Sequence, residues 1–299
     1  MSKLPLIVAP MFLVSTPEMV IEAGKAGVIG SFPLLNARPV EVCEEWLEQI
    51  KRELDNFPWA VNFICHKKSN KRYEEDLNLI TKYQPPIVIT SLGKPTEVIE
   101  IVHHYGGIVY SDVASIEHAK KAAEYGVDGL ILVTAGAGGH GGTLNPFAFI
   151  NAVKEFFKGT IILSGGMATG RDIAAAKMMG ADYAYMGTRF IAVKESSAQD
   201  EYKQMVIEAS SSDIIYTNAF SGVHANLLIP SLIKQGIDPK SLKSRNDIDF
   251  SHLVNAKAWR DIWSAGQGVT SVVKQETMKE IIEQLTLEYE EGYSVCTKQ

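Results

Sequence analysis

The sequence predicts an α/β fold, a TIM-type (β/α)8 barrel with a smaller insertion domain after the eighth strand. Eight short apolar runs recur along the chain, with helix-length amphipathic stretches between them. Most runs are continuously apolar rather than alternating, which is typical of parallel strands covered on both faces. Glycines cluster just after several runs, at turns where the backbone can approach a ligand closely.

A doubly wound open sheet is the alternative fold. Its first strand–helix turn should carry a glycine-rich fingerprint. The first such turn here reads Ala9-Pro10-Met11-Phe12 and has no glycine. The number of strand–helix alternations also exceeds what an open sheet usually needs, so the barrel is favoured.

Each predicted strand follows one apolar run, and the predicted helices begin at capping residues. Thr16 and Asn145 are each followed by a first-turn proline, and Gly126 and Gly180 end two further helices. The predicted strands are Leu6–Ala9, Val28–Ser31, Ala60–Ile64, Ile87–Thr90, Ile108–Ser111, Gly129–Val133, Thr160–Ser164 and Tyr183–Met186. The clearest predicted helices are Thr16–Ala26, Ser115–Tyr125, Pro146–Phe157, Gly170–Met179 and Gln275–Tyr289.

The strand–helix rhythm breaks after the eighth strand. The following stretch has a polar start, mixed patterns and a charged segment over 240–249. We therefore expect a barrel over residues 1–195, an insertion or lid domain over 196–259, and a return to the barrel with a C-terminal helix over 260–299.

Composition excludes several classes of protein. The 299 residues are 46% hydrophobic with a net charge of -6, which argues against a disordered chain. No apolar run is long enough to span a membrane, and no dense Lys/Arg cluster offers a nucleic-acid surface. The expected partners are therefore a small-molecule substrate and not a nucleic acid or a membrane, while a homo-oligomer stays open.

Cysteine usage and the first residues predict a cytoplasmic protein. Cys43, Cys65 and Cys296 are far apart in the sequence, which predicts neither a disulfide framework nor a zinc site. The N-terminal apolar run is short and is broken by Pro5 and Pro10, unlike a signal peptide. We expect reduced thiols and no metal site.

Glycines at the ends of the last two strands predict an anion site. The seventh run ends in Ser164 and is followed by Gly165 and Gly166, and the eighth is followed by Gly187 and Thr188. In a barrel these turns are where a phosphate is held by backbone N–H groups and a helix N-terminus. The alternative is that the glycines only turn tight corners.

A glycine-rich loop after the sixth strand contains one histidine. His140 lies within the segment Thr134–Thr143, which includes Gly138 and Gly139 and can lie flat against a planar ligand. A histidine there can act as a base, an acid or a hydrogen-bond donor near neutral pH. A solvated loop histidine is the alternative, and surface or packing roles are expected for His66, His103, His104, His118, His224 and His252.

Three weaker features also fall at the strand ends. Asp112 is either a ligand contact or part of a helix cap, and Asn62 and Ser91 should point into the barrel mouth. The segment Asp261–Gly268, with one Trp and one Gln among small residues, is either a loop against a ligand or only a turn.

Together these motifs resemble the nitronate monooxygenase family, also called 2-nitropropane dioxygenases. The resemblance runs from about residue 5 to about residue 270, and the combination makes it specific. Its motifs are Ala9-Pro10-Met11, Gly138-Gly139-His140-Gly141-Gly142, Ser164-Gly165-Gly166-Met167, Met186-Gly187-Thr188-Arg189-Phe190 and Trp263-Ser264-Ala265-Gly266-Gln267.

This resemblance implies an FMN-dependent oxidoreductase that oxidises alkyl nitronates or nitroalkanes with molecular oxygen. His140 resembles the family's catalytic histidine, and the phosphate would be held by Gly165, Gly166, Gly187 and Thr188. The full cofactor-binding set that it implies is Ala9, Pro10, Met11, Asn62, Thr90 (or Ser91), Asp112, Gly138, Gly139, Ser164, Gly165, Gly166, Met186, Gly187, Thr188 and Gln267.

Two other functions stay open. Flavin-dependent enoyl-acyl-carrier-protein reductases, which use NAD(P)H, share the barrel, the FMN site and the Gly-Gly-His loop. They commonly carry an acidic residue before the double glycine, where this chain has Ala135-Gly136-Ala137, so the sequence favours the monooxygenase. The third function, from another class, is a barrel that binds a phosphorylated metabolite without flavin chemistry.

Overall fold

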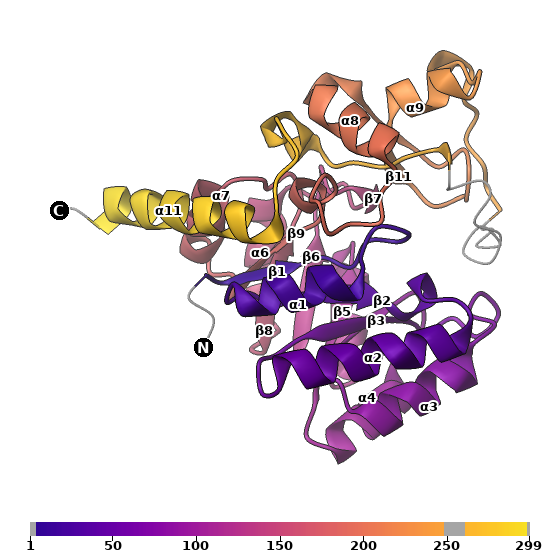
Figure 1. Cartoon of the computed structure of the whole chain (residues 1–299), viewed down its shortest axis with the longest axis vertical. Helices are drawn as coiled ribbons and strands as arrows, with labels where there is room; N and C mark the ends of the chain where they lie inside the picture. Colours follow the sequence, from indigo (N-terminus) through magenta and orange to yellow (C-terminus); the bar gives the residue numbers. More distant parts are fainter. Residues whose placement is uncertain (1–3, 248–260, 298–299) are drawn as a thin grey trace.

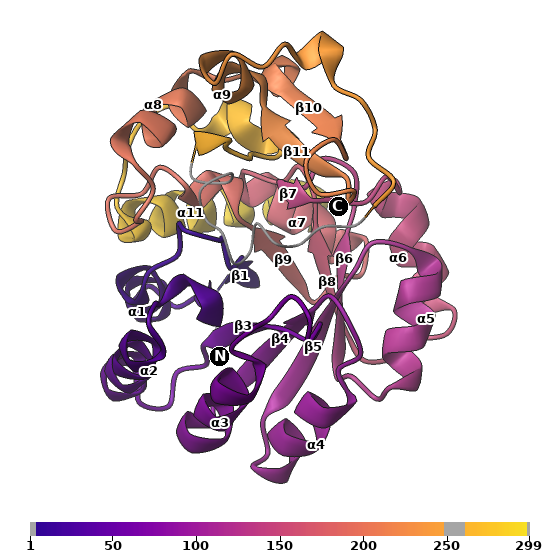
Figure 2. The ribbon, with the colours of Figure 1, turned by 90° about the vertical axis from the view of Figure 1, so that its right-hand side faces the viewer.

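Eight parallel strands form a nearly closed barrel, which confirms the predicted fold class (Figure 2). The computed structural model describes residues 4–247 and 261–297. The hydrogen-bonded order is β1-β9-β8-β6-β5-β4-β3-β2, and a parallel bridge between Ile7 and Ile29 brings the two edges together. The strands are β1 Leu6–Val8, β2 Ser31–Pro33, β3 Ala60–Ile64, β4 Ile87–Ser91, β5 Ile108–Val113, β6 Gly129–Val133, β8 Thr160–Ser164 and β9 Tyr183–Met186.

Helices surround the barrel, and the predicted caps Thr16 and Asn145 are confirmed. The side chains of Thr16, Ser115, Asn145 and Thr169 each accept a backbone N–H in the first turn of a helix. The helices around the strands are α1 Pro17–Lys25, α2 Val40–Leu54, α3 Tyr73–Tyr83, α4 Thr96–His104, α5 Ile116–Glu124, α6 Pro146–Lys154, α7 Gly170–Met178 and α11 Met278–Thr297. No helix in the described part of the chain is both long and apolar enough to cross a membrane.

The second strand differs from the prediction. The sequence predicts it over Val28–Ser31, whereas β2 covers Ser31–Pro33. Ile29 instead exchanges backbone hydrogen bonds with the neighbours of Ile7 on β1, and the ladder to β3 starts only at Ser31. The first residues of this run therefore close the barrel against β1, and the residues that follow pair with β3.

Two apolar layers lie on opposite faces of the strands. The inner cluster fills the barrel and includes Ile7, Ile89, Tyr110, Ile131 and Ile162. The outer clusters join the other face of the strands to the helices. Because successive side chains in a strand point to opposite faces, this division shows which residue at each strand end faces the barrel interior.

The segment after β9 lies over the carboxyl ends of the barrel strands (Figures 1 and 2). It contains the helices α8 Asp200–Glu208 and α9 Ile229–Lys234 and the strands β10 Ile214–Thr217 and β11 Ala225–Leu228. A two-residue strand from the barrel, β7 Gly139–His140, completes its three-stranded antiparallel sheet. The expected boundary at 259/260 lies outside the described residues, and the three-part division stays a prediction.

Candidate active site

Polar side chains replace the apolar core at the upper end of the barrel interior. Asn62, Ser91, Asp112 and Ser164 each lie two positions beyond a residue of the inner cluster, so they face the same way one layer higher. They come from β3, β4, β5 and β8. Amide, hydroxyl and carboxyl groups therefore line the barrel interior where the strands end.

Three of these residues form a hydrogen-bonded chain across adjacent strands. The Asn62 amide donates to Ser91 Oγ at 2.7 Å, and Ser91 Oγ donates to Asp112 Oδ2 at 2.5 Å. Asp112 Oδ1 is buried and has no hydrogen-bond partner among the described residues. Burial raises the pKa of Asp112 to about 6, and the hydrogen bond from Ser91 opposes this rise.

One asparagine, Asn36, is hydrogen-bonded to the loop after β1. Asn36 accepts from the Leu13 N–H and donates to the carbonyls of Met11 and Ser15. Leu13 adopts a positive φ of 59°, so the chain turns back sharply just after Pro10. Asn36 thus fixes the first turn at the strand ends.

The turns after β8 and β9 differ in the space around their glycines. Gly166 has a φ of +68°, and a Cβ placed there would meet no heavy atom within 4 Å. Its N–H and that of Met167 have no hydrogen-bond partner in the described ranges. Gly187 is close enough to Met11 that a Cβ there would lie 3.4 Å from Met11 Sδ. Free N–H groups beside open space suit a bound anion.

The glycine-rich loop after β6 packs against the chain that returns to the barrel. A Cβ on Gly138 would lie 2.8 Å from the Gly266 nitrogen, and the Gly266 N–H donates to Thr188 Oγ1 at 2.8 Å. The Gln267 N–H donates to the Gly136 carbonyl at 2.9 Å. The predicted phosphate turn, the Gly138 loop and the predicted Gln267 segment therefore meet.

His140 lies on β7, where the barrel loop pairs with the insertion. It is in register with Ala225 on β11, and its Nε2 lies 3.5 Å from Ser221 Oγ. Asn226, 3% exposed, donates to the Ala137 carbonyl at 2.6 Å. Tyr216 donates to the Gly141 carbonyl at 2.9 Å. The half-buried His140 is thus fixed by strand pairing rather than carried on a free loop.

Two predicted contacts, Thr90 and Met186, and the motif residue Trp263 are not brought to this face. Thr90 lies on the outer face of β4, where its hydroxyl bonds the Tyr110 carbonyl and the Ser111 hydroxyl. The Met186 side chain belongs to the outer cluster under α11. Trp263 stacks on Tyr202 at 5.0 Å between ring centroids, within a separate apolar cluster. Strand alternation decides the first two cases, since Ser91 and Tyr185 face inward instead.

Several residues of this region were not expected from the sequence. Asn36, Ser221 and Asn226 act through contacts distant in sequence, so no local pattern marks them. Tyr185 could have been found by alternation along β9. Burial, followed by the nearby Asp112 carboxyl, raises the pKa of its phenol.

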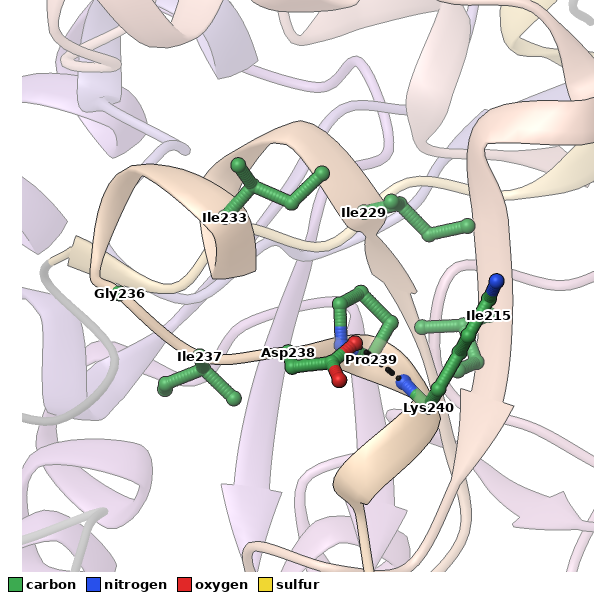
Figure 3. Close-up of a pocket in the computed structure, with 8 residues that line it drawn as sticks. All are labelled: Ile215, Ile229, Ile233, Gly236, Ile237, Asp238, Pro239 and Lys240. Carbon is green, nitrogen blue, oxygen red and sulfur yellow. Dashed lines mark hydrogen bonds between the residues drawn. The ribbon is translucent and has the colours of Figure 1, made fainter.

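A separate cavity of about 650 Å³ lies in the insertion (Figure 3). It is lined by Ile215 on β10, by Ile229 and Ile233 on α9, and by Ile237 and Lys240. None of the predicted site residues lines it. It therefore does not mark the predicted site.

Comparison with known proteins decides the family. The sequence model of the nitronate monooxygenase family matches residues 32–288. The chain belongs to this family. A nitronate monooxygenase of Paraburkholderia phytofirmans is 25% identical over 282 residues, covering 79% of this chain and 76% of the relative. An octahydro-indene-carboxyl-CoA dehydrogenase of Rhodococcus jostii is 26% identical, covering 77% and 64%.

Solved structures show the same architecture. A mutant of FabK from Thermotoga maritima superposes with a TM-score of 0.81 at 25% identity, covering 99% of this chain and 95% of that one. A nitroalkane oxidase from Streptomyces ansochromogenes superposes with a TM-score of 0.80 at 23% identity, covering 98% of each chain. As a member of the nitronate monooxygenase family, the chain is an oxidoreductase of a flavoenzyme family.

The residues at the strand ends fit a flavin. Gly166 offers open space beside N–H groups for a phosphate. Ala9 and Ser91, at the mouth, carry small side chains. Asp112 carries a buried carboxyl, and Ser91 and Asn62 carry polar groups for a ring's polar edge.

Proposed function

We propose that this member of the nitronate monooxygenase family oxidises alkyl nitronates with molecular oxygen in an FMN-dependent reaction. The observation that carries the proposal is the position of His140. The histidine is paired to β11 in a glycine-rich loop that contacts the predicted phosphate turn through Gly138, Gly266 and Thr188. A fixed titratable group beside a flavin site suits proton transfer from a substrate.

FMN is the flavin we propose, because the open space beside the Gly166 N–H would take its phosphate and the polar side chains at the strand ends would face its ring. Gly165, Gly166, Gly187 and Thr188 would hold the phosphate through backbone N–H groups and one hydroxyl. Ala9, Pro10, Met11 and the inward-facing Asn62 and Ser91 would line the ring, with Asp112 hydrogen-bonded to Ser91. When bound, the flavin supplies the electron transfer, which no side chain of the protein provides.

His140 would act on the substrate's acidic C–H. A nitroalkane carries a proton beside an electron-withdrawing group, so a neutral imidazole can remove it or donate a hydrogen bond to the nitronate oxygens. The Ser221 hydroxyl near Nε2 would then help to set the tautomer. A preformed nitronate needs no base, so His140 should matter less with it.

An acyl-thioester oxidoreductase is the second candidate. The relative from Rhodococcus jostii is named as a dehydrogenase of a carboxyl-CoA compound, which is a thioester. The same flavin site would serve such a substrate with NAD(P)H or another electron carrier. The replacement of an acidic residue by Ala135-Gly136-Ala137 argues against the enoyl-reductase form of this function.

One pair of experiments separates these functions. The purified protein should be yellow and should consume oxygen with propyl nitronate. Anaerobic bleaching of its flavin by NADH, with no oxygen uptake on nitronate, would favour the thioester function. A colourless protein that takes up no added FMN would leave the third function, binding of a phosphorylated metabolite.

A cytoplasmic location remains part of the proposal. Cys43 and Cys65 are buried free thiols, and burial raises the pKa of each to about 12. Protonated, enclosed thiols are compatible with a reducing compartment.

A further inference from the structure

We propose that Ser91 donates a hydrogen bond to the bound flavin ring only when Asp112 carries a proton. The inference rests on the proposed function, because the flavin is the ligand it concerns. It assigns to Asp112 the control of a neighbouring hydroxyl rather than a direct contact. Three observations support it: the geometry of the chain, the surroundings of the carboxyl, and the position of Ser91 in the mouth.

The Ser91 hydroxyl can donate only one hydrogen bond and accept two. A serine hydroxyl has one donor proton and two acceptor lone pairs. Asn62 Nδ2, which can only donate, takes one lone pair of Ser91 Oγ at 2.7 Å. Asp112 Oδ2 lies 2.5 Å from Ser91 Oγ. It either accepts the Ser91 proton or, when protonated, donates to the other lone pair of Ser91 Oγ. The protonation state of Asp112 decides which.

The protonation state of Asp112 decides whether Ser91 still has a proton to donate to a ligand. An ionised carboxylate can only accept, so it binds the Ser91 proton and leaves the hydroxyl with nothing to donate. A protonated Asp112 donates through Oδ2 to Ser91 Oγ. Both lone pairs of Ser91 are then occupied, by Asn62 and by Asp112, and its proton is free for a ligand. Half-buried Ser91 faces the mouth at the end of β4, so a ligand there can receive that proton.

The surroundings of Asp112 favour the protonated state. Its neighbour in register on β6 is the apolar Ile131. The titratable group set against it from β9 is Tyr185, whose pKa is raised by burial and by Asp112 itself. No described cation compensates the carboxylate, and burial places its pKa at about 6.

A flavin ring offers the matching acceptors, its two carbonyl oxygens and ring nitrogens. Since the donor exists only in the protonated protein, flavin binding should raise the pKa of Asp112 and take up a proton near neutral pH. One added hydrogen bond corresponds to an affinity gain of about tenfold.

The test is a titration of the apoprotein with FMN, measured by quenching of flavin fluorescence. Asp112→Asn is the matched variant, because its amide donates to Ser91 at every pH. The FMN phosphate itself titrates near pH 6, so each affinity is divided by that of Asp112→Asn at the same pH. The wild type should match Asp112→Asn at about pH 5 and bind about tenfold more weakly at about pH 8.

Three further variants make the test specific. Ser91→Ala should bind weakly at both pH values, and Asp112→Asn should add nothing in its background. Should Asp112→Asn fail to fold, the ratio of wild-type to Ser91→Ala affinity for FMN must itself rise about tenfold between about pH 8 and about pH 5.

Asp55→Asn, an exposed control, should follow the wild type. A His140→Gln background removes the titration of the loop histidine and should keep the ratio.

The outcomes distinguish the inference from the proposed function. A wild type that follows Asp112→Asn at every pH overturns the inference. So does tighter wild-type binding at high pH, since the ionised carboxylate would then be accepting from the ring. Absence of FMN binding in every protein overturns the proposed function and the inference together.

Discussion

His140 on β7 lies directly opposite Ala225 on β11, so the candidate catalytic histidine belongs to the sheet of the insertion as much as to the barrel. Asn226, next along β11, donates to the Ala137 carbonyl in the same loop. The insertion therefore orients the glycine-rich loop. Substitutions in the insertion should lower kcat more than they weaken cofactor binding.

Asn226→Ala tests this role of the insertion. The change leaves the buried Ala137 carbonyl without its donor, at a cost of about 1–3 kcal/mol that should appear as a less ordered loop. We expect FMN affinity within a few-fold of wild type and a clear loss of kcat with nitroalkane. Steady-state kinetics and flavin titration measure the two effects. Asn56→Ala, at an exposed asparagine, is the control, and equal losses in both variants would refute the role.

Gly138→Ala tests the contact between the loops. Its Cβ would lie 2.8 Å from the Gly266 nitrogen, so the loop and the returning chain must separate near Thr188. We expect FMN affinity to fall at least tenfold, since backbone groups of the cradle move with them. Gly24→Ala, whose Cβ would meet the buried Leu54 side chain, should lower thermal stability but leave FMN affinity unchanged. Unchanged affinity in Gly138→Ala would contradict the predicted cradle.

The barrel was predictable because its strands are short, apolar and separated by capped helices. The strands at Ala60–Ile64, Gly129–Val133, Thr160–Ser164 and Tyr183–Met186 have the predicted bounds. β7 was not predictable, because two residues carry no alternation. Its partner on β11 lies far along the chain, so only the folded protein brings the pair together.

The candidate site was predictable as a region but not side chain by side chain. The glycine turns are readable because their positions follow from the strand ends. The choice between Thr90 and Ser91 depends on the pleat of β4, which an apolar run does not reveal. Asn36 and Asn226 were missed because each acts on a backbone distant in sequence.

Asp112→Asn should stabilise the apoprotein at high pH. The pKa of Asp112 is raised in the folded protein, to about 6, so its contribution to stability is full below the pKa of the unfolded chain and is lost as the pH rises through about 6. The neutral amide avoids that loss. Urea unfolding should show a gain of up to about 3 kcal/mol at about pH 8 and almost none at about pH 4. A gain that is independent of pH, or confined to acid, would contradict the burial of this carboxyl.

His140→Ala should separate proton abstraction from flavin binding. We expect the variant to retain FMN and to lose about 10²–10⁴-fold in turnover with neutral nitroalkane, the usual contribution of a positioned base. With preformed nitronate the loss should be much smaller, because the proton has already been removed. His118→Ala, at an exposed histidine, should behave as wild type. Equal turnover of His140→Ala and wild type with nitroalkane would show that His140 is not the base.

Mixing the purified protein with propyl nitronate in the absence of oxygen shows whether this protein oxidises nitronates through a bound flavin. We expect a visible flavin band that bleaches on mixing and returns when oxygen is admitted. A flavin band that does not respond to nitronate, or its absence after FMN has been added, would show that the protein does not carry out this reaction.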